Sequence, residues 1–157
     1  MSSLKNKSIL VTGGSGFIGS HVIDALIKEE PENIVTTNNF FLTRVENLDD
    51  AKKAFPKLKI IKQDMTDLDG VEHTLQNNPV DVVFNLAVVP LPTSLVRPKW
   101  SYVQNIMMTA HLLELARKNV FKTLIQYSSS EAYGTAKYIP MDESHPLDPT
   151  TPYAASK

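Results

Sequence analysis

The chain has no cysteine in its 157 residues, which excludes disulfide bonds, thiolate metal sites and a catalytic thiol. It also lacks an excess of one charge, since 16 Lys and Arg stand against 17 Asp and Glu with the signs interspersed, so a nucleic acid partner is not favoured. No apolar run approaches the roughly 20 residues that span a bilayer, and residues 1–7 lack the apolar centre of a signal peptide. We expect one soluble, unprocessed, cytoplasmic domain with no membrane contact.

The four histidines give no indication of a metal site. They are scattered along the chain without the spacing of metal ligands, so no metal site is predicted. We expect each of them at a surface or helical position: His21, His73, His111 and His145.

Short apolar or β-branched runs alternate with helical patterns. Two helices are predicted from apolar residues at three- and four-residue spacing, one from Phe17 to Ile27 and one from Trp100 to Lys118. Such alternation implies right-handed crossovers and a parallel sheet that is covered on both faces. The predicted fold is an α/β, Rossmann-type doubly wound sheet. Its five strands are expected at residues 8–12, 34–37, 58–61, 80–86 and 123–127.

Glycines stand at positions 13, 16 and 19, directly between the first strand and the first helix. Gly13 can supply the tight turn, Gly16 lets the backbone approach a pyrophosphate, and Gly19 lets the helix pack closely on the sheet. The helix start, with Phe17 and Ile18, offers free N–H groups to phosphates. A glycine-rich turn can also exist without a ligand, but this strand-turn-helix context favours dinucleotide binding.

The usual acidic residue at the end of the second strand is missing. An Asp or Glu there normally holds the adenosine ribose, whereas this chain has Asn38 and Asn39. Asn38 can still hydrogen-bond to a ribose, but it brings no charge to repel a 2′-phosphate. Arg44 is either a phosphate ligand or a solvated loop residue. The residues favour NAD and leave NADP open.

Residues 12–20 (TGGSGFIGS) and 153–157 (YAASK) resemble the extended short-chain dehydrogenase/reductases, and specifically the nucleotide-sugar epimerase/dehydratase branch. The resemblance runs along the whole chain. It implies that Asp64 and Met65 lie at the adenine and that Asn105 belongs to the site. It further implies that a segment after the fourth strand lines the cofactor: Leu86, Ala87 and Val88.

Tyr153 and Lys157 form the pair that carries the predicted chemistry. A phenol with a pKa near 10 is a poor base at neutral pH unless a cation stabilises the phenolate. Lys157, four residues on along one helix, can do this, and Thr151 and Pro152 suit the start of that helix. The resemblance implies that Tyr153 and Lys157 also contact the cofactor.

The serine segment before Gly134 supplies the other catalytic candidates. The resemblance implies that Ser129 is the catalytic serine and that its hydroxyl shares a hydrogen bond with the substrate oxygen. We assign Tyr133 to packing. Glu131 is either a general base that assists dehydration or a solvent-facing glutamate, and its position in the motif slightly favours a dehydratase. The apolar residues 88–92 either line the nicotinamide pocket or simply pack.

Members of this family run to roughly double this length. We therefore expect residues 1–157 to be an incomplete dinucleotide-binding domain without its substrate domain, with residues 131–152 as an irregular loop and the fifth strand as an exposed edge. The expected parent is an NAD(P)-dependent nucleotide-sugar epimerase or 4,6-dehydratase, and the alternative is a non-catalytic dinucleotide-binding module. A nucleotide sugar is the expected substrate and a homodimer a possible assembly.

Overall fold

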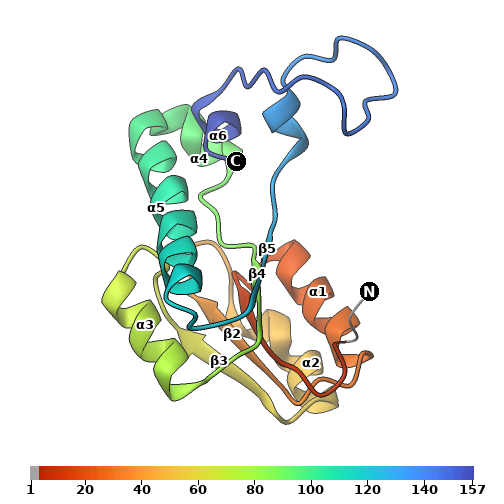
Figure 1. Cartoon of the computed structure of the whole chain (residues 1–157), viewed down its shortest axis with the longest axis vertical. Helices are drawn as coiled ribbons and strands as arrows, with labels where there is room; N and C mark the ends of the chain where they lie inside the picture. Colours follow the sequence, from red (N-terminus) through yellow and green to blue (C-terminus); the bar gives the residue numbers. More distant parts are fainter. Residues whose placement is uncertain (1–3) are drawn as a thin grey trace.

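The computed structural model describes residues 4–157 and contains one parallel sheet of five strands. Strand order is β3-β2-β1-β4-β5 (Figure 1). The strands β2 and β3 are therefore added on one side of β1, and β4 and β5 are added on its other side. This arrangement confirms the doubly wound α/β fold. The strands are β1 (Ser8–Thr12), β2 (Asn33–Asn38), β3 (Leu58–Lys62), β4 (Val82–Asn85) and β5 (Thr123–Gln126).

Helices cover both faces of the sheet, with α1 and α2 on one side and α3 and α5 on the other (Figure 1). Two short α-helices, α4 and α6, stand beyond the carboxyl ends of the strands, beside the upper part of α5. Two 3₁₀ turns complete the fold, at Val45–Leu48 and Ser130–Tyr133. The α-helices are α1 (Phe17–Ile27), α2 (Asp49–Ala54), α3 (Leu68–Asn77), α4 (Leu91–Val96), α5 (Pro98–Arg117) and α6 (Pro152–Ala155).

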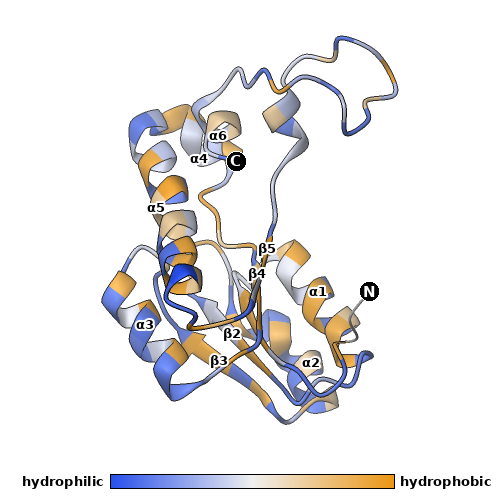
Figure 2. Cartoon of the chain, viewed as in Figure 1, coloured by the Kyte–Doolittle hydropathy of each residue, from blue (hydrophilic) through white to orange (hydrophobic). Residues whose placement is uncertain are grey.

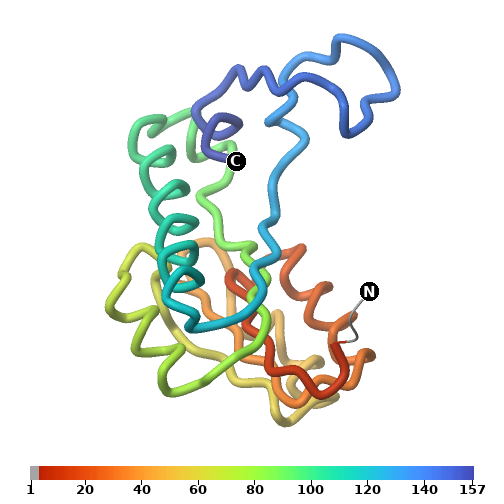
Figure 3. Tube along the Cα trace, in the orientation of Figure 1, coloured from red at the N-terminus to blue at the C-terminus, as the bar shows by residue number. Residues whose placement is uncertain are grey.

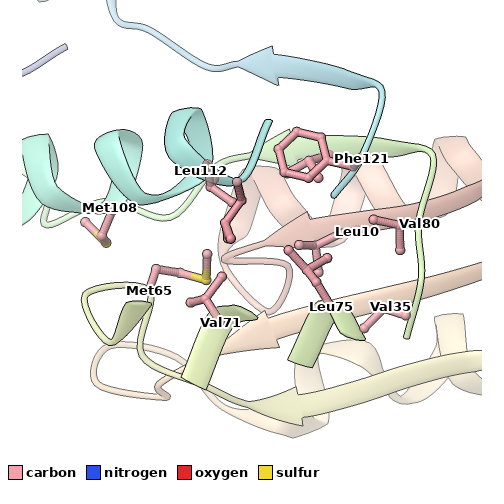
Figure 4. Packing of buried hydrophobic residues seen from close by; sticks show 11 residues of the cluster. Leu10, Val35, Met65, Val71, Leu75, Val80, Met108, Leu112 and Phe121 are labelled. Atoms are coloured by element: carbon pink, nitrogen blue, oxygen red, sulfur yellow. The ribbon is translucent and has the colours of Figure 1, made fainter. Parts of the chain in front are cut away.

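The larger core lies between the sheet and the helices α3 and α5 (Figure 4). Leu10 and Val35 project from the central strands toward Leu75 of α3 and Leu112 of α5. A second core on the opposite face buries Ile23 and the alternate strand residues, such as Ile9 and Ile34, under α1 and α2. Because both faces are buried, the central strands are continuously apolar rather than alternating.

Three helices are not singled out by the sequence pattern: α2 and α4, which have six residues each, and α3, which has ten. Residues 88–92, expected to be a loop, run into α4 at Leu91. The long helix begins at Pro98, two residues before the predicted Trp100, because proline at the first helical position is favourable. Within residues 4–157 no helix has both the length and the apolarity to cross a bilayer.

His145 corrects the expectation for the histidines, because it lies in a loop and is only 3% exposed. Its Nε2 accepts the Lys137 N–H at 2.9 Å, and its Nδ1 lies 2.9 Å from the Pro146 carbonyl oxygen. The rings of Tyr133 and Tyr138 pack against it. The irregular loop is confirmed, but it has a small core of its own.

β5 is the open edge of the sheet, as expected. It pairs with β4 on one side only, and Thr123, Ile125 and Gln126 are exposed. After β5 the chain leaves the sheet, forms the projecting loop and returns beside α4 and α5 (Figure 3). This return brings the last residues of the chain close to the segments that follow β4 and β5.

Candidate cofactor and active site

The glycine turn joins β1 to α1 in a conformation that requires glycine. Gly13 has φ +69°, in the left-handed region that L side chains rarely adopt. A Cβ on Gly19 would collide with the Gly13 carbonyl oxygen, so Gly19 packs against the turn itself. A Cβ on Gly16 would meet only the Gly13 oxygen, at 3.1 Å. Gly16 therefore keeps the backbone open for a ligand.

Gly14, to which the glycine pattern assigns no role, makes the close approach to the sheet. A Cβ there would strike the Thr36 hydroxyl of β2 and come within 2.8 Å of Ile23 Cδ1 of α1. The close packing assigned to Gly19 in the sequence is therefore divided between two glycines. Nothing local distinguishes Gly14, because the atoms it must avoid come from distant residues.

A polar network that the sequence does not reveal links the carboxyl ends of three strands. The Thr12 hydroxyl donates to Asn85 Oδ1 at 2.6 Å and accepts the N–H groups of Leu86 and Ala87. Asn85 in turn donates to Gln126 Oε1 at 2.8 Å. Because Thr12 and Asn85 are buried, this network sets the direction of the chain after β4.

A cavity of about 410 Å³ opens at this edge of the sheet. It brings together most of the predicted cofactor residues: Gly13, Gly16, Asn38, Asn39, Asp64, Met65, Leu86, Ala87 and Val88. The wall is completed by the β2 loop, with Phe41 and Leu42, and by α5, with Trp100 and Met108. The sequence missed these last four residues because their positions depend on how the elements pack.

Several predicted site residues do not line the cavity. Phe17 and Ile18 are exposed at the start of α1, and Gly19 lies beneath the turn. For Phe17 and Ile18, only their backbone N–H groups at the helix start remain suitable for a phosphate. The other residues outside the cavity are Asn105, Ser129, Glu131, Tyr153 and Lys157.

Asp64 is held as an acceptor on the cavity wall. Burial opposes its ionisation, but hydrogen bonds from the backbone and hydroxyl of Thr66 and from the Asn39 amide outweigh burial and lower the pKa of Asp64. The carboxylate is therefore charged at neutral pH. Asn39 also accepts the Phe41 N–H at 3.0 Å, which ties the β2 loop to the same wall.

The glycine turn is attached directly to the loop after β2. Ser15 is buried, and its hydroxyl lies 2.7 Å from the Thr43 hydroxyl. Asn47 donates to the Ser15 carbonyl oxygen at 2.9 Å. These bonds hold the loop residues 39–47 in a constant position relative to the turn.

Asn105 is a buried clamp rather than part of the cavity wall. Its Oδ1 accepts the Val89 N–H at 2.7 Å, and its Nδ2 donates to the Val89 carbonyl and to the Ser156 hydroxyl. Asn105 is 4% exposed. It therefore joins α5 to the segment after β4 and to the end of α6.

α6 starts as the sequence predicts. The Thr151 hydroxyl accepts the Ala154 N–H at 3.0 Å, and Pro152 is the first helical residue. However, α6 ends at Ala155, and the Lys157 N–H bonds to the Ala154 carbonyl three residues back. Burial lowers the pKa of Lys157.

The serine segment lies against the end of α6. The Ser128 hydroxyl donates to the Lys157 carbonyl at 3.0 Å, and Ser129 accepts the Glu131 N–H at 3.2 Å. Ser129 is half-buried, and its hydroxyl hydrogen remains available to a ligand. Tyr133 packs on His145, which supports its assignment to packing. Among residues 4–157, no three His, Asp or Glu side chains gather in a group that could hold a metal ion.

Known proteins share both the sequence pattern and this geometry. The profile of the family described as GDP-mannose 4,6 dehydratase matches residues 10–157. A putative UDP-glucose 4-epimerase of Methanocaldococcus jannaschii is 34% identical over 153 residues, which are 95% of this chain and 47% of that protein.

Two solved structures superimpose on nearly the whole chain. UDP-glucose 4-epimerase from Bifidobacterium longum in complex with NAD+ and UDP has a TM-score of 0.88 at 29% identity, covering 96% of this chain and 45% of its own. dTDP-glucose 4,6-dehydratase from Bacillus anthracis in complex with NAD has a TM-score of 0.80 at 30% identity, covering 96% and 47%. This chain spans about half the length of these relatives. By its fold, its glycine turn and the matched profile, the chain belongs to the GDP-mannose 4,6 dehydratase family of the extended short-chain dehydrogenase/reductases.

Proposed function

We propose that this chain is the cofactor-binding part of an NAD-dependent enzyme that modifies nucleotide sugars. The observation that carries the proposal is the single cavity that extends from the glycine turn to Asp64, Met65 and the segment after β4. Relatives of the same fold are an epimerase solved with NAD+ and UDP and a dehydratase solved with NAD.

The residues of the cavity fit the parts of a dinucleotide in order. Gly13 and Gly16, with the N–H groups at the start of α1, suit the pyrophosphate. Asn38 and Asn39 suit the adenosine ribose, and Asp64 and Met65 the adenine. Residues 86–88, which also line the cavity, would hold the nicotinamide end of the cofactor.

Bound NAD supplies the acceptor for a hydride from C4 of the sugar. Tyr153 takes the proton of the C4 hydroxyl, and the Lys157 ammonium stabilises the resulting phenolate. Ser129 donates a hydrogen bond to the same oxygen. Glu131, half-buried beside Ser129, is the candidate base for proton removal next to the C4 ketone, which distinguishes a 4,6-dehydratase from an epimerase.

A second candidate function is dinucleotide binding without catalysis. The observation that favours it is that Ser129, Tyr153 and Lys157 do not line the cavity. In this case the chain binds NAD but converts no sugar.

One experiment separates the two. Trp100 is the only tryptophan and lines the cavity, so its fluorescence reports NAD binding directly. The chain is then incubated with NAD and UDP-, GDP- or dTDP-hexoses, and products are identified by mass spectrometry. Sugar conversion that is lost in Tyr153→Phe supports the enzyme, NAD binding without conversion supports the binding module, and no NAD binding refutes both.

We also propose that the chain pairs with a second copy of itself through α5. The outward side of this helix carries exposed apolar residues, which we call the α5 stripe. Figure 2 shows that hydrophobic residues recur along α5. A stripe at helical spacing suits packing against another helix. Its members are Tyr102, Val103, Ile106, Met107 and Leu113.

A further inference from the structure

His111 joins helix α5 to the segment that follows β3. Its Nδ1 lies 3.0 Å from the Met65 carbonyl oxygen. A carbonyl oxygen can only accept a hydrogen bond, so the His111 Nδ1 carries a proton and is the donor. His111 is half-buried and does not line the cavity. The imidazole therefore acts on the backbone of a cavity residue and not on a ligand.

Met65 and Met108 are two buried side chains of the cavity wall that come from different elements. Met65 follows β3, Met108 belongs to α5, and Figure 4 shows both in the larger core. The Met65 sulfur accepts the Thr37 hydroxyl at 3.4 Å, which ties its side chain to β2. Methionine side chains are flexible, so their shapes alone do not fix the separation of the two elements. That separation requires a further link.

The hydrogen bond of His111 supplies this link. Met108 and His111 are three residues apart on α5 and are therefore neighbours on its surface. The bond to Met65 thus fixes how closely α5 approaches the segment after β3 where the two methionines lie. Within residues 4–157, the other polar link between α5 and this segment or α3 is the Lys118–Glu72 ion pair, at 3.3 Å. It lies about two turns further along α5 and outside the cavity wall.

We infer that His111 is a positioning residue for the adenine end of the cofactor. It holds Met65 and Met108 at the separation that admits a flat base, and it acts through the Met65 backbone without touching the ligand. Loss of the donor leaves the Met65 carbonyl oxygen without this partner and frees α5 to shift. The inference rests on the proposed dinucleotide binding, which places the adenine at Asp64 and Met65, and deepens it by naming a residue behind the wall that sets the affinity.

The test compares His111→Leu, which keeps the bulk and removes the donor, with His111→Asn. The asparagine Nδ2 is attached to Cγ, as Nδ1 is in histidine, so it can donate to the same carbonyl oxygen. Binding of NAD and of AMP, which carries the adenine end alone, is measured by calorimetry. We expect His111→Leu to weaken both by about five- to tenfold and His111→Asn to stay within about threefold of the wild type. Lys118→Ala removes the other link and is the matched control, with binding within about twofold of the wild type.

A second measurement reports the hydrogen bond without any cofactor. NMR of the ring nitrogens at about pH 8 should show the proton of His111 on Nδ1, and a proton on Nε2 would overturn the inference.

The binding outcomes separate this inference from the proposed function. Urea denaturation first establishes that each variant is folded. If His111→Leu binds as the wild type does, or if His111→Asn loses as much affinity as His111→Leu, His111 does not position the adenine, while the dinucleotide site stands. If the wild-type chain binds neither NAD nor AMP, the proposed function and the inference fail together.

Discussion

At the scale of single residues, Gly14 and Gly16, two positions apart in the same turn, have different tasks. Gly14 is pressed against the Thr36 hydroxyl and Ile23, whereas Gly16, with φ −71°, faces little but the Gly13 oxygen. A methyl group on Gly14 disturbs the packing of the sheet. A methyl group on Gly16 narrows the space for a pyrophosphate.

We therefore expect Gly14→Ala to lower the free energy of unfolding by about 1–3 kcal/mol, as overpacked sites do. Gly16→Ala should cost less stability but weaken NAD binding clearly, because the added Cβ stands where the backbone must approach the phosphates. Urea denaturation and Trp100 fluorescence titration measure the two quantities. Equal effects of both variants on stability would contradict this division.

Asp81 connects elements at the amino ends of three strands. Its carboxylate accepts the Ser8 N–H at 3.2 Å and the Lys122 ammonium at 3.2 Å. These two hydrogen bonds lower the pKa of Asp81. The carboxylate thus ties β1 and β5 to β4, and this link is stronger while the carboxylate is ionised.

The pH dependence of this link follows from the sign of the shift. A pKa lowered by folding adds stability above the ordinary carboxyl pKa, near 3.9, and this stability is lost as pH falls through the lowered value. Asp81→Asn should lower the free energy of unfolding by about 0.5 kcal/mol at neutral pH, because an exposed pair is screened by solvent. In urea titrations the difference from wild type should shrink as pH falls below the ordinary carboxyl pKa and through the lowered pKa of Asp81. A difference independent of pH would show that charge is not the cause, and Asp24→Asn on α1 is the control.

The loop of residues 134–151 is held by His145. Replacement by alanine removes the acceptor of the Lys137 N–H and the ring against Tyr133 and Tyr138. We expect His145→Ala to leave the sheet folded but to open the loop, so that trypsin cuts at Lys137 several times faster. Mass spectrometry of timed digests measures this rate. Cleavage at the wild-type rate would contradict the role, and Glu143→Ala in the same loop is the matched control.

At the scale of the whole molecule, we predict that two copies of the chain pair through α5. If the α5 stripe binds a second copy, Ile106→Glu places a charge at its centre, and a dimer should become a monomer in sedimentation or light-scattering measurements. Lys53→Glu, an exposed charge change on α2, should leave the mass unchanged. A wild-type chain that is monomeric at high concentration would overturn this proposal without affecting the cofactor site.

Much of the cofactor site could be predicted because its residues lie at the ends of strands. The glycine turn, Asn38, Asp64 and residues 86–88 follow β1 to β4 in sequence, and parallel strands bring their carboxyl ends to one edge. The short helices α2 and α4 escaped prediction, since a few residues carry too little periodicity to be distinguished from a loop. Asn105 was assigned to the site, but its amide is fully used on Val89 and Ser156.

The sequence by itself determined the parallel, doubly wound sheet, the glycine turn and the family, because all three are written in local periodicity and in short motifs. Only the tertiary structure decided which groups face the cavity. The clash that excludes a side chain at Gly14 and the hydrogen bonds that join Asn105 to Val89 and Ser156 both depend on atoms from other elements. Contacts between residues far apart in the chain leave no local pattern, so packing alone turns a list of candidate residues into a site.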